Sequence, residues 1–385
     1  MSTPLQAIER LGGWFRNAAA PLWAEAAWDD AHGGFFEALD YRGDPIRGPR
    51  RVRVQSRQVY AFSMIAARGW HAGAESIAAR GFDYLIDRAC PDGGARGCVF
   101  ILGDDGAVLD DKRDLYDQAF LLLACAARIE TANCNRAAAL AEKTVAFLDR
   151  ELASPHGGWI ESDKGKLPRR QNPHMHLFEA FMAMHHATSD PLWAEKANAV
   201  ADLFDRYFFD DQTETLTEFF GKSLQDRDQR HGAIIEPGHM MEWVWLFGKH
   251  EKIVRSDRLR VMQTLYAAAK KYVDAATGFL PDTVNISGDG NGGNASARRL
   301  WPQTEYIKAA VTLSTSGEDA YALDGAATIS ALFDAYFKQP VDGLWCDQFD
   351  GAGAPVAVDV PASILYHLFE AVATTQDYAE KIGKS

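Results

Sequence analysis

Three histidines each lie three residues before a glutamate, and this spacing is the feature of the sequence that most directly suggests chemistry. The pairs are His176 and Glu179 in HLFEA, His239 and Glu242 in HMMEW, and His367 and Glu370 in a second HLFEA. Residues three apart share one helix face, so each glutamate can accept a ring N–H of its histidine and fix the tautomer. The other ring nitrogen can then transfer protons near neutral pH, because histidine has an unperturbed pKa of about 6.5. Glu242 is alternatively a direct ligand contact.

A repeat positions these histidines. A short marker, in which glycine precedes aromatic or apolar and then acidic residues, recurs at intervals of 59 to 65 residues, at Gly33, Gly93, Gly157, Leu216, Gly278 and Gly343. The fourth marker lacks its glycine. Glycine before a short alternating run predicts a turn into a brief strand, and a fixed period of this length indicates a repeat architecture.

Each interval has room for two helices of different character. Residues 59–67 and 119–127 are apolar nearly all round, whereas 135–152 is amphipathic. Buried helices alternating with half-exposed ones predict an all-α (α/α)6 barrel with short β-hairpins at its mouth. We expect one catalytic domain over residues 1–385, whose N-terminal helix, roughly 5–28, closes the outer ring. An open α-solenoid is the alternative, although neither terminus has the polar cap that such an array usually needs.

Polar residues recur at one level of the otherwise apolar inner helices. In chain order they are Arg57, Tyr116, His176, His239, Gln303 with Glu305, and His367. A buried unpaired polar group costs on the order of 1–3 kcal/mol, so a ring of them is expensive as structure alone. We therefore expect these side chains to converge on the barrel axis and to form a small-molecule site.

Neighbouring residues have supporting roles in this interpretation. We expect Asp114 to cap its helix and Asp117 to support it, and the candidates for the cavity wall are Trp243, Trp301 and Trp345. The segment 285–297, rich in glycine and asparagine, precedes the fifth inner helix. It is predicted to be a mobile lid, with an idle surface loop as the alternative.

Histidine and arginine together suggest transfer of a proton next to a carbonyl group. Arg57 would stabilise the enediolate oxygen while a histidine removes the carbon-bound proton and returns it.

Glycoside hydrolysis usually needs two opposed carboxylates, and Glu305 has no evident partner of that kind. A metal site is a further alternative, but the sequence contains no HExxH motif. The last alternative is a protein that binds sugar without catalysing a reaction. The chain has no GxxxxGK or GxGxxG motif, and we expect neither a cofactor nor a metal.

The composition excludes some classes of binding partner and indicates the cellular compartment. A net charge of −13 and a pI of about 5.3 argue against nucleic acid or an anionic membrane surface as partner. Five scattered cysteines without a CxxC pair favour a reducing compartment, so we expect a cytoplasmic protein. We find no signal-peptide pattern and no apolar run of about 18 residues. The composition does not decide whether the protein forms a homo-oligomer.

Six stretches of the chain resemble the N-acylglucosamine 2-epimerase family of sugar epimerases and isomerases. They are VQSRQVYAF, DLYDQAFLLLA, NPHMHLFEAF, EPGHMMEWVWL, RLWPQTEYIKAA and LYHLFEA, and they span all six repeats. The resemblance implies an (α/α)6 barrel and metal-free proton transfer through a cis-enediol. It implies that His239 and His367 are the acid/base pair and that His176 assists ring opening. It also marks Arg57 as catalytic.

The resemblance further implies a substrate and its contacts. Glu242 and Glu305 would contact sugar hydroxyls, with Arg230 as a further substrate-binding arginine. The predicted substrate-binding set is completed by Tyr116, Asn172, Trp301 and Gln303. EPGHMMEW and LWPQTE are most like the D-mannose isomerase branch, so we expect a monosaccharide substrate and interconversion of D-mannose and D-fructose. The alternatives are 2-epimerisation of N-acylglucosamine or cellobiose, and isomerisation of sulfoquinovose or mannose 6-phosphate. Arg298 and Arg299 are the candidate contacts for the phosphate.

Overall fold

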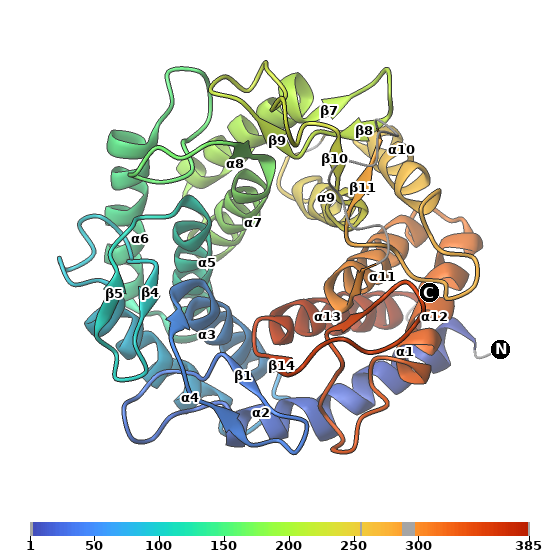
Figure 1. Cartoon of the computed structure of the whole chain (residues 1–385), viewed down its shortest axis with the longest axis horizontal. Coiled ribbons are helices and arrows are strands. Elements are labelled where there is room, and N and C mark those ends of the chain that lie inside the picture. Colours follow the sequence, from blue (N-terminus) through green and yellow to red (C-terminus); the bar gives the residue numbers. More distant parts are fainter. Residues whose placement is uncertain (1–2, 255, 287–296, 384–385) are drawn as a thin grey trace.

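Two concentric rings of helices surround a central axis in the computed structural model, which describes residues 3–254, 256–286 and 297–383. Figure 1 shows the chain passing around the axis once, with inner and outer helices alternating along the sequence. The alternation follows from the two helix types in the sequence, because the helices that are apolar all round are the inner ones, enclosed on every side.

The inner ring is closed. Over the described residues it consists of α3 (Val52–Ala67), α5 (Leu115–Ala132), α7 (Gln171–Thr188), α9 (Pro237–His250), α11 (Leu300–Ser314) and α13 (Ile364–Gly383). Each helix packs against the next, and α13 packs against α3. This last contact rules out the open α-solenoid and confirms the predicted (α/α)6 barrel.

The outer helices each pack on the inner helix that precedes them. They are α4 (Ala74–Tyr84), α6 (Asn135–Phe147), α8 (Pro191–Leu203), α10 (Leu259–Lys270) and α12 (Asp319–Asp334). The first three continue into π-helical turns, η2 (Leu85–Ala89), η3 (Leu148–Leu152) and η4 (Phe204–Phe208). The N-terminal segment comprises α1 (Pro4–Trp14), η1 (Phe15–Ala19) and α2 (Ala20–Ala26). Because α1 packs on α12 and α13, it completes the outer ring as predicted.

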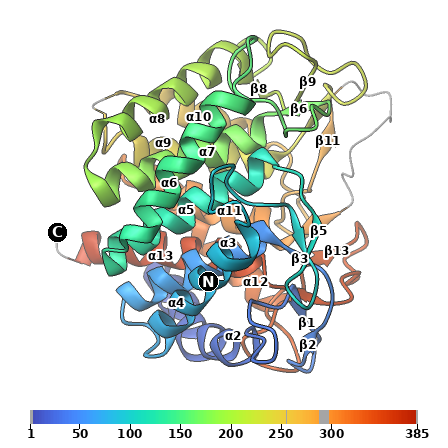
Figure 2. The same ribbon diagram turned by 90° about the vertical axis from the view of Figure 1, so that its left-hand side faces the viewer.

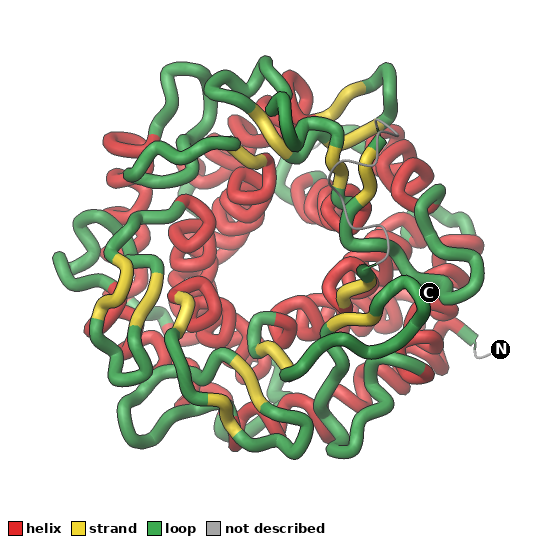
Figure 3. The backbone as a smooth tube through the Cα atoms, in the orientation of Figure 1, coloured by secondary structure: helices red, strands yellow, loops and turns green. Residues whose placement is uncertain are grey.

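Short antiparallel strands gather at one end of the barrel (Figures 2 and 3). The pairings are β1 (Ala38–Leu39) with β2 (Pro45–Ile46) and β14 (Val360–Pro361); β4 (Ile101–Leu102) with β3 (Arg50–Arg51) and β5 (Val108–Asp110); β6 (Arg169–Arg170) with β9 (Phe219–Phe220); β7 (Phe209–Asp210) with β8 (Thr215–Leu216); β10 (Ile234–Ile235) with β11 (Val284–Asn285); and β12 (Arg298–Arg299) with β13 (Gln348–Phe349). Strands β3, β6 and β12 run directly into α3, α7 and α11, so this is the end at which these inner helices begin.

A buried side chain near the start of an inner helix holds the marker segment in four repeats. In three of them a glutamine both accepts from a backbone N–H and donates to the carbonyl of the same residue. The pairs are Gln55 with Phe35, Gln118 with Cys98, and Gln303 with Leu280, at 2.7 to 2.9 Å. In the fourth, His174 accepts from the backbone N–H of Trp159 at 3.1 Å. A Cβ on Gly158, whose φ is +58°, would lie 2.5 Å from the His174 ring, which explains the glycine.

This pattern changes the place assigned to Gln303. Its side chain is fully buried and bonded to the backbone of Leu280, and it does not line the cavity described below. Gln303 is therefore the counterpart of Gln55, which holds its own marker segment in the same way, and not of Arg57, which lines the cavity.

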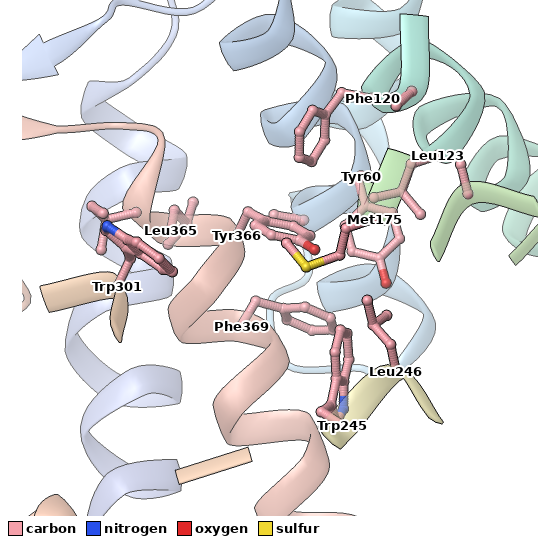
Figure 4. Close-up of a cluster of buried hydrophobic side chains, with 14 of the residues drawn as sticks. Tyr60, Phe120, Leu123, Met175, Trp245, Leu246, Trp301, Leu365, Tyr366 and Phe369 are labelled. Carbon is pink, nitrogen blue, oxygen red and sulfur yellow. The ribbon is translucent and has the colours of Figure 1, made fainter. Parts of the chain in front are cut away.

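Aromatic side chains fill the barrel below the hairpin-bearing end. Tyr60, Phe120, Tyr366 and Phe369 come from α3, α5 and α13, with contacting ring centroids 5.5 to 6.2 Å apart (Figure 4). The inner ring is thus a packed core with a solid floor. None of the helices in the described ranges is long and apolar enough to cross a membrane.

Candidate active site

A cavity of about 700 Å³ occupies the hairpin-bearing end of the barrel. Its walls come from all six repeats, mainly from the first turns of the inner helices and the strands before them. The cavity brings together the predicted residues Arg57, Tyr116, Asn172, His176, His239, Glu242, Trp301 and His367. Its volume falls within the range of small-molecule sites.

The three histidines are held in the same way, each with Nδ1 on a buried carboxylate. Nδ1 of His176 lies 3.1 Å from Glu179, Nδ1 of His239 lies 3.0 Å from Glu218, and Nδ1 of His367 lies 2.9 Å from Glu305. A carboxylate accepts the Nδ1–H, so the neutral ring keeps its lone pair on Nε2. All three rings can therefore present Nε2 to the cavity.

The origin of these carboxylates differs from the sequence prediction in two of the three cases. Only His176 uses the glutamate three residues later on its own helix. Glu242 instead approaches Nε2 of His176, at 4.0 Å, and Glu370 pairs with Tyr60 and Lys249. The prediction for those two pairs was wrong because side chains in a ring of packed helices also face neighbouring segments. Nδ1 of His239 and of His367 binds a carboxylate from such a segment, which lies closer than the glutamate three residues later.

Glu218 was missed by the sequence analysis, although a signal for it exists. In four repeats an acidic residue stands four positions after the marker glycine, as Glu37, Glu161, Asp282 and Asp347. Three of these hold an arginine through both its backbone N–H and its Nε: Glu37 with Arg51, Glu161 with Arg170, and Asp282 with Arg299, at 2.5 to 2.8 Å. Glu218 is the acidic residue of the fourth marker, two positions after Leu216, and it holds His239 instead.

These three arginines line the cavity, and the sequence analysis had named only Arg299 among them, as an anion contact. Each is already paired with its carboxylate. The neighbouring Arg298, by contrast, does not line the cavity and pairs with Asp274 at 3.1 Å.

Arg57 lies against aromatic rings in the cavity wall. Its Nη2 donates to the Tyr116 hydroxyl at 2.7 Å, and its guanidinium carbon lies 4.1 Å from the Phe120 ring centroid. Asp114 accepts from the Tyr116 backbone N–H at 3.2 Å and begins α5, as predicted for a cap. Asp117 accepts from the Arg53 backbone N–H at 2.8 Å. Arg57 therefore offers a fixed positive charge on the cavity wall.

Trp301 separates the two histidines predicted to be the acid/base pair. Its ring centroid lies 5.0 Å from that of His239 and 6.0 Å from that of His367. Nε2 of His239 also meets the Asn172 amide nitrogen at 3.0 Å. Trp243 and Trp345 are fully buried and do not line this cavity.

The surroundings of His239 and His367 shift the pKa values of these two histidines in opposite directions. Burial disfavours the charged form of His239, but the Glu218 and Glu236 carboxylates outweigh it and raise the pKa to about 9. Burial lowers the pKa of His367 well below its usual value, and the positive charges of Arg57 and Lys308 add to this effect. Of these two histidines, His239 therefore favours its charged form at neutral pH and His367 its neutral form.

Two predicted substrate contacts lie elsewhere. Glu305 has an exposed fraction of 0% and lies behind His367, outside the cavity lining. Arg230 is exposed and does not line the cavity. Residues 287–296 of the predicted lid lie outside the described residues.

Groups of histidine and glutamate with the spacing of a metal site occur three times among the described residues. They are His176, Glu179 and Glu242; Glu218, Glu236 and His239; and Glu242, Glu305 and His367. In each group a histidine Nδ1 lies at hydrogen-bond distance from a carboxylate. The Lys308 ammonium, 2.6 Å from Glu305, would repel a second cation in the third group. Each hydrogen-bonded pair can also act as a proton carrier.

Comparison with known proteins agrees with the fold. Residues 34–371 match the family model of N-acylglucosamine 2-epimerase (GlcNAc 2-epimerase). The chain belongs to the N-acylglucosamine 2-epimerase family. A mannose-6-phosphate isomerase of Rhizobium meliloti (strain 1021) is 34% identical over 400 residues, which cover 99% of this chain and 100% of that protein. The family membership and this relative confirm the predicted class of enzyme, an isomerase within a family of sugar isomerases and epimerases.

Solved structures of the family share the barrel. A cellobiose 2-epimerase from Spirochaeta thermophila DSM 6192 has a TM-score of 0.87 at 20% identity, covering 98% of both chains. A D-mannose isomerase has a TM-score of 0.86 at 21% identity, covering 98% of this chain and 100% of that one. An epimerase and an isomerase are thus equally close in fold, so the outcome of the reaction has to be argued from the site.

Proposed function

We propose that this member of the N-acylglucosamine 2-epimerase family is an aldose–ketose isomerase that interconverts D-mannose and D-fructose through a cis-enediol. The observation that carries the proposal is the pair His239 and His367, which line one cavity and whose surroundings shift their pKa values in opposite directions. A neutral histidine can accept a proton from carbon, while a charged one can donate a proton to oxygen.

The reaction proceeds in two balanced steps. In the open-chain aldose, the C2–H bond breaks and its proton passes to Nε2 of His367, while O1 takes up the negative charge. His239 protonates O1, giving the cis-enediol. His367 then returns its proton to C1, the O2–H proton passes to His239, and the C2=O bond of the ketose forms. The site ends in its starting protonation state, so no co-reactant is consumed.

The remaining cavity residues support these steps. Arg57 provides a positive charge for the developing oxyanion. Glu242 Oε1 and Asn172 Oδ1 are buried without a hydrogen-bond partner among the described residues. Buried acceptors of this kind are costly, and sugar hydroxyls would satisfy them. A half-turn of the Asn172 amide would also let its oxygen accept from the charged form of His239.

The substrate assignment rests on the size of the cavity, the aromatic wall at Trp301 and the resemblance of EPGHMMEW and LWPQTE to the D-mannose isomerase branch. Mannose 6-phosphate is the second candidate. It is favoured by the name of the Rhizobium relative and by Arg51, Arg170 and Arg299 on the cavity wall. Because each of these arginines already holds a carboxylate, the uncharged sugar is preferred.

Incubation of the purified protein with each candidate sugar, followed by chromatography of the products, tests the proposal. D-Mannose and D-fructose should interconvert, with kcat/KM at least tenfold above that for mannose 6-phosphate. Conversion of the phosphate alone would establish the second candidate. Turnover of cellobiose or N-acylglucosamine to the 2-epimer, with no ketose formed, would refute isomerisation.

A further inference from the structure

Lys308 on α11 is the one lysine in the described part of the chain that is fully buried, with an exposed fraction of 0%. Its Nζ lies 2.6 Å from Oε2 of Glu305, three residues earlier, and 3.5 Å from the centroid of the Trp245 ring. Trp245 belongs to the cluster of buried side chains that includes Phe369 (Figure 4), and its indole N–H donates to the Thr374 hydroxyl on α13 at 3.0 Å. A buried ammonium is costly unless it is paired, so its presence beneath the cavity calls for a functional explanation.

Glu305 links this ammonium to the cavity. One carboxylate oxygen faces Lys308, and the other lies 2.9 Å from Nδ1 of His367. His367 lines the cavity, whereas Glu305 and Lys308 do not. As long as Glu305 is ionised it must accept the Nδ1–H, and the lone pair of the neutral ring stays on Nε2.

The surroundings of Glu305 oppose its ionisation. Burial and the Glu242 carboxylate raise the pKa of Glu305 well above its usual range, and Lys308 limits this rise without cancelling it. A protonated Glu305 would donate its O–H to Nδ1, moving the ring proton of His367 to Nε2. That nitrogen could then no longer accept a proton from carbon. Other titratable groups that act on Glu305 or His367 include Arg57 on α3, His176 and Glu179 on α7, and His239 and Glu242 on α9.

We propose that Lys308 is a positioning residue of the reaction: by holding Glu305 as a carboxylate, it fixes His367 in the Nδ1–H tautomer with Nε2 free toward the substrate. The inference rests on the proposed function, since it takes His367 to be the base. Lys308 touches no substrate and acts only through Glu305 and His367.

The tautomer of His367 in the wild-type protein is the first test. Nitrogen-15 NMR of the full-length protein labelled at histidine, with the His367 signals identified by their loss in H367A, should show a protonated Nδ1 and a bare Nε2. A protonated Nε2 in the neutral ring would overturn the proposal. This measurement needs no substrate, so its failure is distinct from failure of the proposed function, which would appear as absence of isomerisation by the wild type.

Two lysine substitutions provide the second test. K308M should lower kcat by roughly 100-fold or more, the contribution of a general base, and change KM less than threefold. The His367 ring proton should move to Nε2. K249M is the matched control, because Lys249 lies 3.8 Å from the centroid of the same Trp245 ring but pairs with Glu370, which contacts none of the three histidines. Its kcat should stay within threefold of wild type. A wild-type kcat in K308M, or a loss of kcat with the Nδ1–H tautomer retained, would contradict the proposal.

A double variant separates positioning from folding. In K308M/E305Q the amide oxygen of residue 305 can accept the Nδ1–H without a nearby cation, so kcat should recover at least tenfold over K308M. If thermal unfolding shows that K308M alone is not folded, the double variant, which leaves no unpaired charge, is compared with wild type directly. A folded double variant with no activity above H367A would overturn the proposal.

Discussion

Nδ1 of His367 lies 2.9 Å from Oε1 of Glu305 on the neighbouring inner helix, although Glu370 stands three residues after His367 on its own helix. His239 likewise takes its partner, Glu218, from a hairpin segment and not from its own helix. Contacts from outside its own helix therefore set which nitrogen carries the proton in His239 and in His367. Local sequence spacing does so only for His176.

This relationship predicts different outcomes for two glutamates that have the same sequence spacing. E179Q should lower kcat by roughly tenfold or more, because Glu179 holds Nδ1 of His176. E370Q should keep kcat within threefold, because Glu370 contacts Tyr60 and Lys249 instead. Steady-state kinetics of both variants, with thermal unfolding as the check on folding, decides between them. Equal losses in the two variants would show that the spacing itself matters.

Removing either histidine of the acid/base pair should stop the reaction without unfolding the protein. General acid–base catalysis contributes roughly 100- to 10,000-fold, so H239A and H367A should each lose at least 100-fold in kcat. Circular dichroism should show an unchanged helix content. Rates like the wild type in both variants would contradict the mechanism. The alternatives would then be a glycoside hydrolase that uses carboxylates or a sugar-binding protein without catalysis.

The charge on His239 should give the pH–rate profile an alkaline limb. A histidine is charged below its pKa, and the pKa of His239 is raised to about 9 by Glu218 and Glu236 against the effect of burial. The kcat should therefore fall as the pH rises through about 9. E218Q removes one of the two carboxylates, so the same limb should move to lower pH. An alkaline limb at the same pH in both proteins would show that another group controls it.

The reaction should withstand removal of metal ions. The histidine and glutamate groups with metal-site spacing are joined by hydrogen bonds between Nδ1 and a carboxylate, which leaves them able to work as proton carriers. Exhaustive treatment with EDTA, followed by dialysis against metal-free buffer, should leave kcat unchanged. Loss of activity that returns on adding zinc or manganese would assign at least one of these groups to a metal.

The sequence predicted the barrel because its signals are local and repeated. The marker glycines and the two helix types recur at a nearly constant period, and a period can be counted without knowing the fold. The positions of Arg57, His176, His239 and His367 at one level follow from the same period. The predicted spans 59–67 and 119–127 lie within the observed inner helices α3 and α5.

The pairs of interacting side chains within the site could not be predicted from the sequence, because they depend on contacts between helices. Glu305 was predicted to touch the sugar, yet it lies behind His367 and beside Lys308. Gln303 was assigned to the polar ring, but it holds a hairpin through two backbone hydrogen bonds. Both errors concern which residues of α11 face the cavity, and that is fixed by the rotation of α11 against its neighbours.

Proton NMR of the chelator-treated protein with D-mannose in deuterated water tests the central claim most directly. Transfer of the C2 proton through a histidine that exchanges with solvent should give fructose carrying deuterium at C1. Glucose deuterated at C2 would instead show that the enediol is reprotonated at C2, as in an epimerase. Mannose that remains unlabelled and unconverted would contradict the assignment of His367 and His239 to proton transfer on this sugar.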